Sequence, residues 1–416
     1  MMKLNAVSLL VDFIVSILHL YRDIFVTYYM RPTYIDIIRQ DLLHIITGYN
    51  NYYGLIDYTI NPINLTNEIN EIIDYSLSFY HSLLMPERSS GNTYIRITPS
   101  ISCINNKLGF LDTFDYTKQR SAEWYEFRNN HLTASNIWKV FFSDSSRNQL
   151  IYEKCKSTNT LNVAPSTGQV NLNTPMHWGN KYEPLSIKIY EDMYKTVIKE
   201  YGCIPHRKYQ YIAASPDGIN VCETSRRYGR MIEVKNIVNR EITGIPKLEY
   251  WIQMQMQLEV CDLNECDFIE TRFIEYPGYT EFIADKNTDY KGLIMLFMTE
   301  DQAPHYVYAP IQRTDYDKWS EDIMEENAVL KREWVKNIYW KLETFSCVLV
   351  LRNKTWFRVS VPQIESLWNT INAEKINGFE HRAPQRRKPT SSVKPFINRD
   401  NSYDVLEEGI CLLSVE

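Results

Sequence analysis

The chain of 416 residues is 44% hydrophobic and 13% aromatic, which is enough apolar material for a folded protein of two or three packed units. Its formal net charge of −6 argues against a protein that coats nucleic acid along its whole surface, but it allows a local basic groove beside a carboxylate-rich metal site. The eight cysteines form no CxxC pair, so they argue against a structural zinc site and favour a reducing compartment over a disulfide framework.

Residues 1–112 are predicted to form a helical N-terminal unit. Apolar residues recur three and four positions apart in two stretches, residues 35–49 and 67–84. The apolar stretch of residues 4–29 is interrupted by Asp12 and His19, whereas a membrane span needs roughly 20 apolar residues. It also has no basic leader and no small-residue cleavage site, so a buried helix is predicted and neither a membrane span nor a signal peptide is expected.

Residues 113–345 are predicted to form a mixed α/β unit. Ser121 can cap a helix that begins beside it, and residues 132–142 continue in a helical pattern. Further helices are predicted over residues 183–200, 248–260 and 315–342, and strands over residues 208–215, 230–237 and 266–276. A hydrophilic insert at residues 222–230 is expected to lengthen a hairpin near the site described below.

Two smaller parts follow. Residues 346–375 are predicted to form a hairpin that turns at Asn353 and Lys354, followed by a short helix. Residues 376–416 are rich in Pro, Ser and basic residues, and they are predicted to be a disordered basic tail. Two explanations of the tail's charge stay open, a solvated segment without a specific role and a segment for DNA contact or nuclear import.

The chemistry is carried by the sequence Ser-Pro-Asp-Gly ending at Gly218 and by Glu-Val-Lys at residues 233–235. In a strand, residues two apart share a face, so Glu233 and Lys235 project together while their apolar neighbours face a core. The turn that holds Asp217 can bring this carboxylate against Glu233. Two adjacent carboxylates repel each other unless a hard divalent cation binds between them. Lys235 can then orient the attacking water and oppose negative charge on a phosphate.

This pattern is the PD-(D/E)xK nuclease signature, although a surface ion pair beside an ordinary turn explains the bare motif equally well. The flanking blocks favour the nuclease. They are the helix start at residues 178–183, the glutamine-rich helix at residues 248–260 and the upstream block at residues 119–135. In this order, over residues 117–320, the chain resembles the lambda-exonuclease-like (YqaJ) recombinase nucleases, which include the alkaline nucleases of large DNA viruses.

The resemblance implies an α/β restriction-endonuclease-like core, a mixed central sheet flanked by helices, to which the helical N-terminal unit and a small C-terminal extension are added. It implies Mg²⁺ as cofactor, with Mn²⁺ as a substitute, held by Asp217, Glu233, the carbonyl of Val234 and Glu183. Lys235 matches the catalytic lysine, and Gln253 matches the glutamine that fixes this lysine and the water. The added units put the ring-shaped trimer of the phage enzyme in doubt, and the oligomeric state stays open.

The same resemblance implies a grip on the 5′-phosphate of a DNA end. Arg128 and Ser135 match the gripping residues, and Thr133 and Arg120 lie in the same block. A guanidinium fork and a hydroxyl supply several donors to phosphate oxygens.

The expected function is a 5′-to-3′ exonuclease that resects double-stranded DNA in viral DNA recombination, replication or genome processing. Two alternatives remain, a structure-selective endonuclease with the same metal site and a non-catalytic DNA-binding module on the nuclease fold. Every expected catalytic position holds the right residue type, which favours an active enzyme. The expected partners are double-stranded DNA ends and a single-stranded-DNA-binding or annealing protein. Binding to a membrane is not expected. The expected place is intracellular, in the host nucleus or at a viral replication site.

Overall fold

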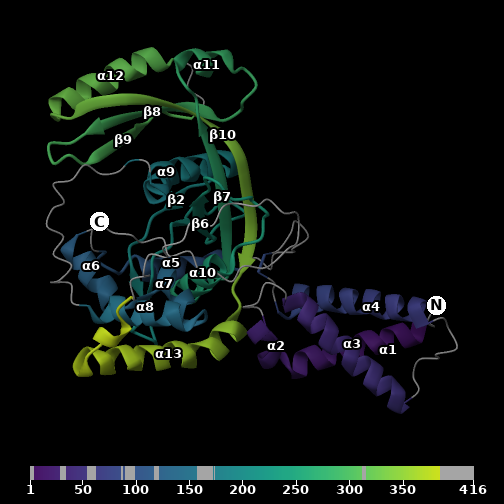
Figure 1. The fold of residues 1–416 in the computed structure, drawn as a ribbon. Helices are drawn as coiled ribbons and strands as arrows, with labels where there is room; N and C mark the ends of the chain where they lie inside the picture. The colour runs from purple at the N-terminus through teal and green to yellow at the C-terminus, as the bar shows by residue number, and fades with distance from the viewer. Residues whose placement is uncertain are drawn as a thin grey trace, which may run out of the picture.

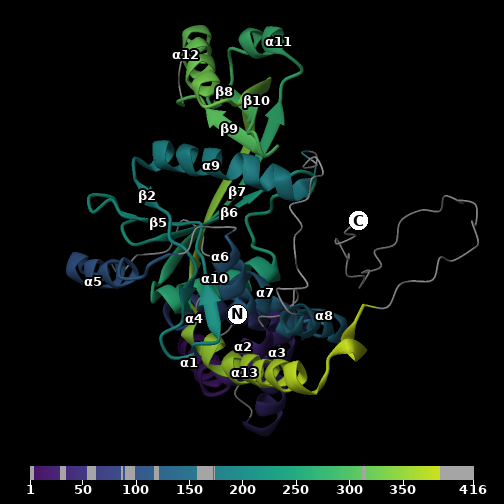
Figure 2. The same cartoon turned by 90° about the vertical axis from the view of Figure 1, so that its left-hand side faces the viewer.

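The computed structural model describes residues 4–28, 34–53, 62–85, 88–89, 99–116, 121–156, 172, 174–311 and 315–384. Figure 1 shows a long curved sheet with helices on both sides and the N-terminal helices beside its lower end. The two views agree that α11 (Tyr279–Ala284) and α12 (Tyr316–Val329) lie at one end of the molecule, and α8 (Asp144–Cys155) and α13 (Lys354–Asn377) at the other (Figures 1 and 2).

The N-terminal unit is helical, as predicted. Its helices are α1 (Leu4–Leu20), α2 (Arg22–Tyr28), α3 (Tyr34–Tyr53) and α4 (Pro62–Leu83). Apolar residues three and four positions apart form one stripe along each of α1, α3 and α4, and these stripes pack against one another. Ile14, Leu42 and Ile73 lie in these stripes and are therefore fully buried. None of the helices in the described part of the chain has the length and apolarity needed to cross a bilayer. Helix α5 (Ile101–Leu111) contacts the α/β unit, because the side-chain amide of Asn105 donates a hydrogen bond to Glu223.

The described residues contain a seven-stranded mixed sheet, which confirms the predicted α/β core with helices on its flanks. Its strand order is β2 (Ile198–Lys199), β5 (Gly218–Asn220), β6 (Met231–Asn236), β7 (Glu265–Glu275), β10 (Glu333–Leu351), β8 (Lys291–Met298) and β9 (Pro304–Tyr308). Strands β6 and β7 run parallel, and the other neighbours are antiparallel. A smaller sheet has the order β1 (Leu132–Thr133), β4 (Ile212–Ala214) and β3 (Ile204–Pro205).

Two helices cover the two faces of the sheet at β6. Helix α9 (Pro175–Tyr194) packs Ile187 and Tyr190 against Ile232 and Val234 of β6. Helix α10 (Leu248–Cys261) lies on the opposite face, where its glutamines reach Glu233. The alternation of β6 is therefore as predicted, with its apolar pair towards one helix and its polar pair towards the other.

Several predicted elements are wrong in whole or in part. The predicted helix over residues 183–200 ends at Tyr194, and Ile198 and Lys199 form strand β2. Residues 315–342 are not one helix, because α12 ends at Val329 and β10 begins at Glu333, after Lys331 with a left-handed φ of 53°. Residues 346–375 do not form a hairpin, because β10 runs on to Leu351 and pairs with β7. Asn353 caps α13 by accepting the Trp356 N–H at 2.9 Å, so the expected turn is a helix start.

The predicted disordered tail begins too early in the sequence. Arg382 donates to Glu374 of α13 at 2.7 Å and also pairs with Asn148 of α8, so the chain stays folded onto the core beyond residue 376. The remainder of the predicted tail, residues 385–416, lies outside the described residues.

Candidate active site

The β5–β6 hairpin brings the two predicted carboxylates together. Gly218 of β5 pairs with Ile232 of β6, so Asp217 lies level with Glu233. The Oδ2 atom of Asp217 accepts the backbone N–H of Val234 at 2.7 Å. This bond uses one oxygen of Asp217 to fix the turn and leaves its other oxygen free of that constraint.

Glu233 is fully buried and is held by three side-chain donors. Its Oε1 atom accepts from the Lys235 ammonium and, at 2.7 Å, from the Gln253 amide. Its Oε2 atom accepts from the Gln257 amide at 2.7 Å. The sequence had identified Gln253 only, although Gln257 lies four residues later on the same helix and therefore shares its face.

The charges of the site are strongly coupled to one another. Burial raises the pKa of the Asp217 carboxyl well above its usual range, and Glu233 raises it further, against the lowering effect of Lys235. Burial alone would lower the pKa of Lys235, but its attraction to Glu233 and Asp217 outweighs burial and raises it. Lys235 therefore stays protonated, while ionisation of the Asp217 carboxyl is opposed.

The donor set fits a hard divalent cation bound through oxygen. Oε1 of Glu233 has two donors and Oε2 has one, so Oε2 has room for a further partner, as does Oδ1 of Asp217. Mg²⁺ binds proteins through one or two carboxylates and completes its shell with water and substrate phosphates. A cation between Asp217 and Glu233 would also relieve the repulsion that raises the pKa of Asp217.

Glu183 lies on α9, and its charge is close enough to raise the pKa of the Asp217 carboxyl. Within the residues that the structure describes, however, no three His, Cys, Asp or Glu side chains are grouped closely enough to hold a metal ion. The structure therefore brings Asp217 and Glu233 together as a pair, with Glu183 as a more distant neighbour.

Three of the four predicted phosphate-gripping residues lie together. Arg128 of α6 (Ala122–Asn129) donates to Ser135 at 3.3 Å, and the Ser135 hydroxyl lies 3.3 Å from that of Thr133. The Arg128 guanidinium lies 4.5 Å from the centre of the Trp124 ring. Burial lowers the pKa of Arg128, and a partly desolvated guanidinium binds an anion more strongly than a solvated one. Arg120 lies outside the described residues.

The group formed by Arg128, Ser135 and Thr133, here called the Arg128 block, is connected to the carboxylates through the smaller sheet. Leu132 and Thr133 of β1 pair in parallel with Ile212 and Ala213 of β4. The chain then reaches Asp217 within a few residues. A short strand pair therefore fixes the position of the Arg128 block relative to the carboxylate pair.

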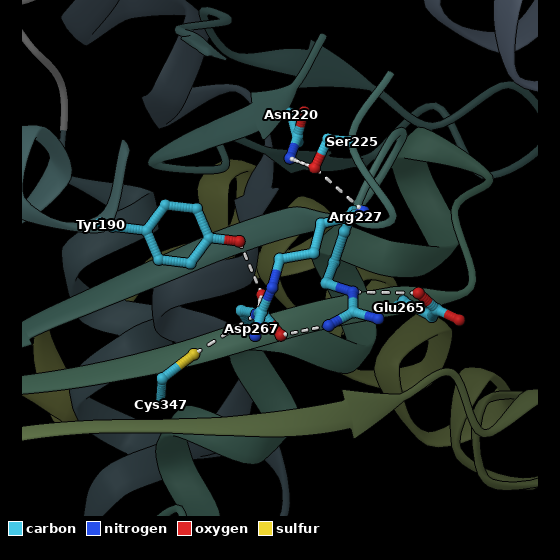
Figure 3. Close-up of polar contacts among 8 residues, drawn as sticks. Tyr190, Asn220, Ser225, Arg227, Glu265, Asp267 and Cys347 are labelled. Carbon is cyan, nitrogen blue, oxygen red and sulfur yellow. Dashed lines mark hydrogen bonds and ion pairs between the residues drawn. The ribbon is translucent and has the colours of Figure 1, made fainter. Parts of the chain in front are cut away.

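An ion network on the opposite face anchors the hairpin (Figure 3). Asp267 of β7 accepts from Tyr190 at 2.6 Å, from Arg230 at 3.0 Å and from Arg227. Arg230 also donates to Glu265 at 3.0 Å. Both arginines belong to the hydrophilic insert between β5 and β6, which does lengthen the hairpin, as expected. The insert folds back onto β7 and so fixes the two strands that position Asp217 and Glu233.

The raised pKa of Asp217 predicts a change in stability when metal is removed. In the unfolded chain this carboxyl ionises freely above about pH 4, whereas in the metal-free fold its ionisation is opposed. The resulting cost is absent at acid pH and grows as the pH rises. The Asp217→Asn variant should therefore melt at a higher temperature than the wild type in EDTA at pH 8.5. Its melting temperature should rise less than that of the wild type when Mg²⁺ is added. Equal melting temperatures in EDTA would contradict this account of the site.

Comparison with known proteins gives four matches. Residues 123–264 match the family described as the YqaJ-like viral recombinase domain. An uncharacterized protein of Acanthamoeba polyphaga mimivirus is 28% identical over 356 residues, which cover 73% of this chain and 63% of that protein, so the chain spans less than two thirds of its length. An alkaline exonuclease from Laribacter hongkongensis is 19% identical with a TM-score of 0.37, covering 63% of this chain and 98% of the exonuclease.

A phage related exonuclease from Haemophilus somnus is 13% identical with a TM-score of 0.33, covering 58% of this chain and 94% of that one. The match of residues 123–264 confirms the resemblance drawn from the sequence, and it supports the expectation of an enzyme that cleaves DNA. The matched segment contains the carboxylate pair, Lys235, both glutamines and the Arg128 block.

Proposed function

We propose that this chain, whose residues 123–264 match the YqaJ-like viral recombinase domain, is a divalent-metal-dependent nuclease that resects double-stranded DNA in the 5′-to-3′ direction. The observation that carries the proposal is the pair of carboxylates, Asp217 and fully buried Glu233, joined to the ammonium of Lys235 on the same strand. Two carboxylates and one lysine brought together in this way are the groups that metal-assisted phosphodiester hydrolysis requires.

Each of these residues has a separate task in the proposed mechanism. Asp217 and Glu233 would hold Mg²⁺ or Mn²⁺, and the carbonyl of Val234 and, through water, Glu183 would serve as further donors. When bound, the cation lowers the pKa of water and polarises the phosphate. Lys235 remains charged beside Glu233, so it opposes the negative charge that develops on the phosphate and orients the attacking water. Gln253 holds Glu233 at the oxygen that also accepts from Lys235, which fixes the lysine relative to the carboxylate.

The Arg128 block favours an exonuclease over a structure-selective endonuclease. Arg128, Ser135 and Thr133 supply donors to one phosphate, and a grip on a terminal phosphate positions the next phosphodiester at the cation. A non-catalytic DNA-binding module is the weaker alternative, because both carboxylates, the lysine and Gln253 are present, and Lys235 and Gln253 both donate to Glu233.

The proposed role is in viral DNA recombination, replication or genome processing. It is supported by the family description and by the relative in a mimivirus. The proposed partners are DNA ends and a single-stranded-DNA-binding or annealing protein, which would cover the strand that resection exposes. Such an enzyme would act inside the infected cell, in the host nucleus or at a viral replication site.

Digestion of three forms of one plasmid tests this function. Linear, nicked and covalently closed DNA are incubated with Mg²⁺, with Mn²⁺ and with EDTA. We expect progressive loss of the linear form with either metal, little action on the closed circle and none in EDTA. Cleavage of the closed circle at a rate equal to that of the linear form would favour the endonuclease, and activity in EDTA would exclude the proposed mechanism.

A second expected result concerns the terminal phosphate. Arg128→Ala should remove the preference of the enzyme for 5′-phosphorylated over 5′-hydroxyl ends. A charge-assisted contact contributes about 1.5–3 kcal/mol, or about ten- to a hundredfold in rate if it acts in the transition state. The measurement is single-turnover digestion of short duplexes that differ only in the 5′ end.

The surface-exposed Arg226, which lies in the hydrophilic insert, provides the control. Arg226→Ala should keep both the rate and the end preference. If Arg128→Ala also keeps them, Arg128 is a structural partner of Trp124 and Ser135 only, and the endonuclease gains support.

A further inference from the structure

Helix α10 presents a second glutamine to the carboxylate pair, and its contacts differ from those of Gln253. Gln257 is fully buried. Its Nε2 atom donates to Oε2 of Glu233 at 2.7 Å and to the backbone carbonyl of Ser215 at 3.1 Å. One amide group therefore connects the β6 carboxylate to the turn that holds Asp217.

The orientation of this amide follows from its partners. Both atoms that it faces are acceptors, a carboxylate oxygen and a carbonyl oxygen, so only the NH₂ group can lie between them. The other end of the amide, Oε1, is buried without a hydrogen-bond partner among the described residues. A buried acceptor without a partner costs stability. Gln257 therefore holds the two acceptors with its NH₂ group and leaves its side-chain carbonyl oxygen without a hydrogen bond.

The two acceptors belong to both halves of the cation site. Oε2 is the oxygen of Glu233 that has room for a cation, because Oε1 already accepts from Lys235 and Gln253. The Ser215 carbonyl precedes Pro216, whose ring restricts the backbone, so its position directs the turn that ends at Asp217. We propose that Gln257 is a positioning residue that sets the affinity of the carboxylate pair for a divalent cation. This inference rests on the proposed function, since it concerns the same site.

Gln255 provides a matched control two residues away. It lies on the same helix, is 1% exposed and also makes two hydrogen bonds, donating to the Leu351 carbonyl at 2.9 Å and accepting from the Asn353 N–H at 2.6 Å. These partners belong to the junction of β10 and α13 and not to the carboxylates. Gln255→Met and Gln257→Met therefore remove the same number of bonds from equally buried places, and only the second removes a contact with Glu233.

The test measures binding of Mg²⁺ and Mn²⁺ to the full-length protein without DNA, by calorimetry and by the rise in melting temperature. Gln257→Met should weaken binding about tenfold, the change expected when one hydrogen bond to a charged group is lost. The Mg²⁺ concentration for half-maximal DNA cleavage should rise by a similar factor, while the rate at saturating Mg²⁺ changes less. Gln255→Met should lower the melting temperature in EDTA and leave metal binding as in the wild type.

The outcomes separate this inference from the function on which it rests. A wild type that neither binds metal nor cleaves DNA overturns the proposed function. A wild type that does both, with a Gln257→Met variant of unchanged metal affinity, overturns the role of Gln257 alone and makes it a packing residue. If Gln257→Met does not fold, Gln257→Asn gives the same test, because its amide ends one methylene short of both acceptors.

Discussion

Alanine at Asp217, Glu233 or Lys235 should reduce the rate of DNA cleavage by about a thousandfold or more, because each substitution removes a group that the proposed mechanism assigns to the metal or the phosphate. Loss of either carboxylate removes half of the pair that is proposed to hold the cation. Loss of Lys235 removes the charge that opposes the phosphate and leaves Glu233 without its ion-pair partner. The three effects should be far from additive, since each single change already disables the same unit.

The measurement is single-turnover digestion of a linear duplex at saturating Mg²⁺, with circular dichroism and thermal melting of each variant. Glu183→Ala serves as the internal comparison, because Glu183 lies outside the carboxylate pair and affects Asp217 through its charge. We expect it to lose less activity than the other three. A folded Lys235→Ala variant with wild-type rate would exclude the proposed mechanism.

The elements that carry the chemistry could be predicted from the sequence because their signals are local. Strand β6 alternates polar and apolar residues, and α10 keeps one apolar face over its whole length. Asp217, Glu233, Lys235 and Gln253 could be identified in the same way, since a short motif and its flanking blocks name them. Their mutual contacts confirm that the motif is a buried cluster and not a surface ion pair.

The errors occurred where long-range pairing decides the structure. Residues 333–342 contain Trp, Val, Ile and Tyr at spacings compatible with a helix or a strand, and pairing with β7 and β8 makes them a strand. Asn353 suits both a turn and a helix cap, and its backbone bond to Gln255 selects the cap. The contacts of Gln257 with Glu233 and Ser215 were not predicted, although its position four residues after Gln253 places the two glutamines on one face of α10.

The ion network behind the hairpin also could not be predicted from the sequence, because Asp267 lies far along the chain from its partners Arg227 and Arg230. Asp267 is 1% exposed and Arg230 11%, so the network is removed from water. Removing one member of a buried ion pair leaves the others as uncompensated charges, which costs about 3–5 kcal/mol, far more than a surface pair contributes. We therefore expect substitution of Asp267, which is remote from the carboxylate pair, to lower the free energy of unfolding strongly.

Asp267→Asn should lower the free energy of unfolding by about 3–5 kcal/mol, measured from urea denaturation, because two guanidinium groups and the Tyr190 hydroxyl lose a charged acceptor. Glu300→Gln provides the control, since Glu300 and Lys331 are 71% and 79% exposed and their loss should change stability by less than about 0.5 kcal/mol. Adding Arg227→Met to Asp267→Asn should cost less than Arg227→Met alone, because the arginine has already lost its partner. If the cost were the same in both backgrounds, Arg227 and Asp267 would be energetically independent, and the hairpin would owe its place on β7 to packing with Tyr194 and the sheet.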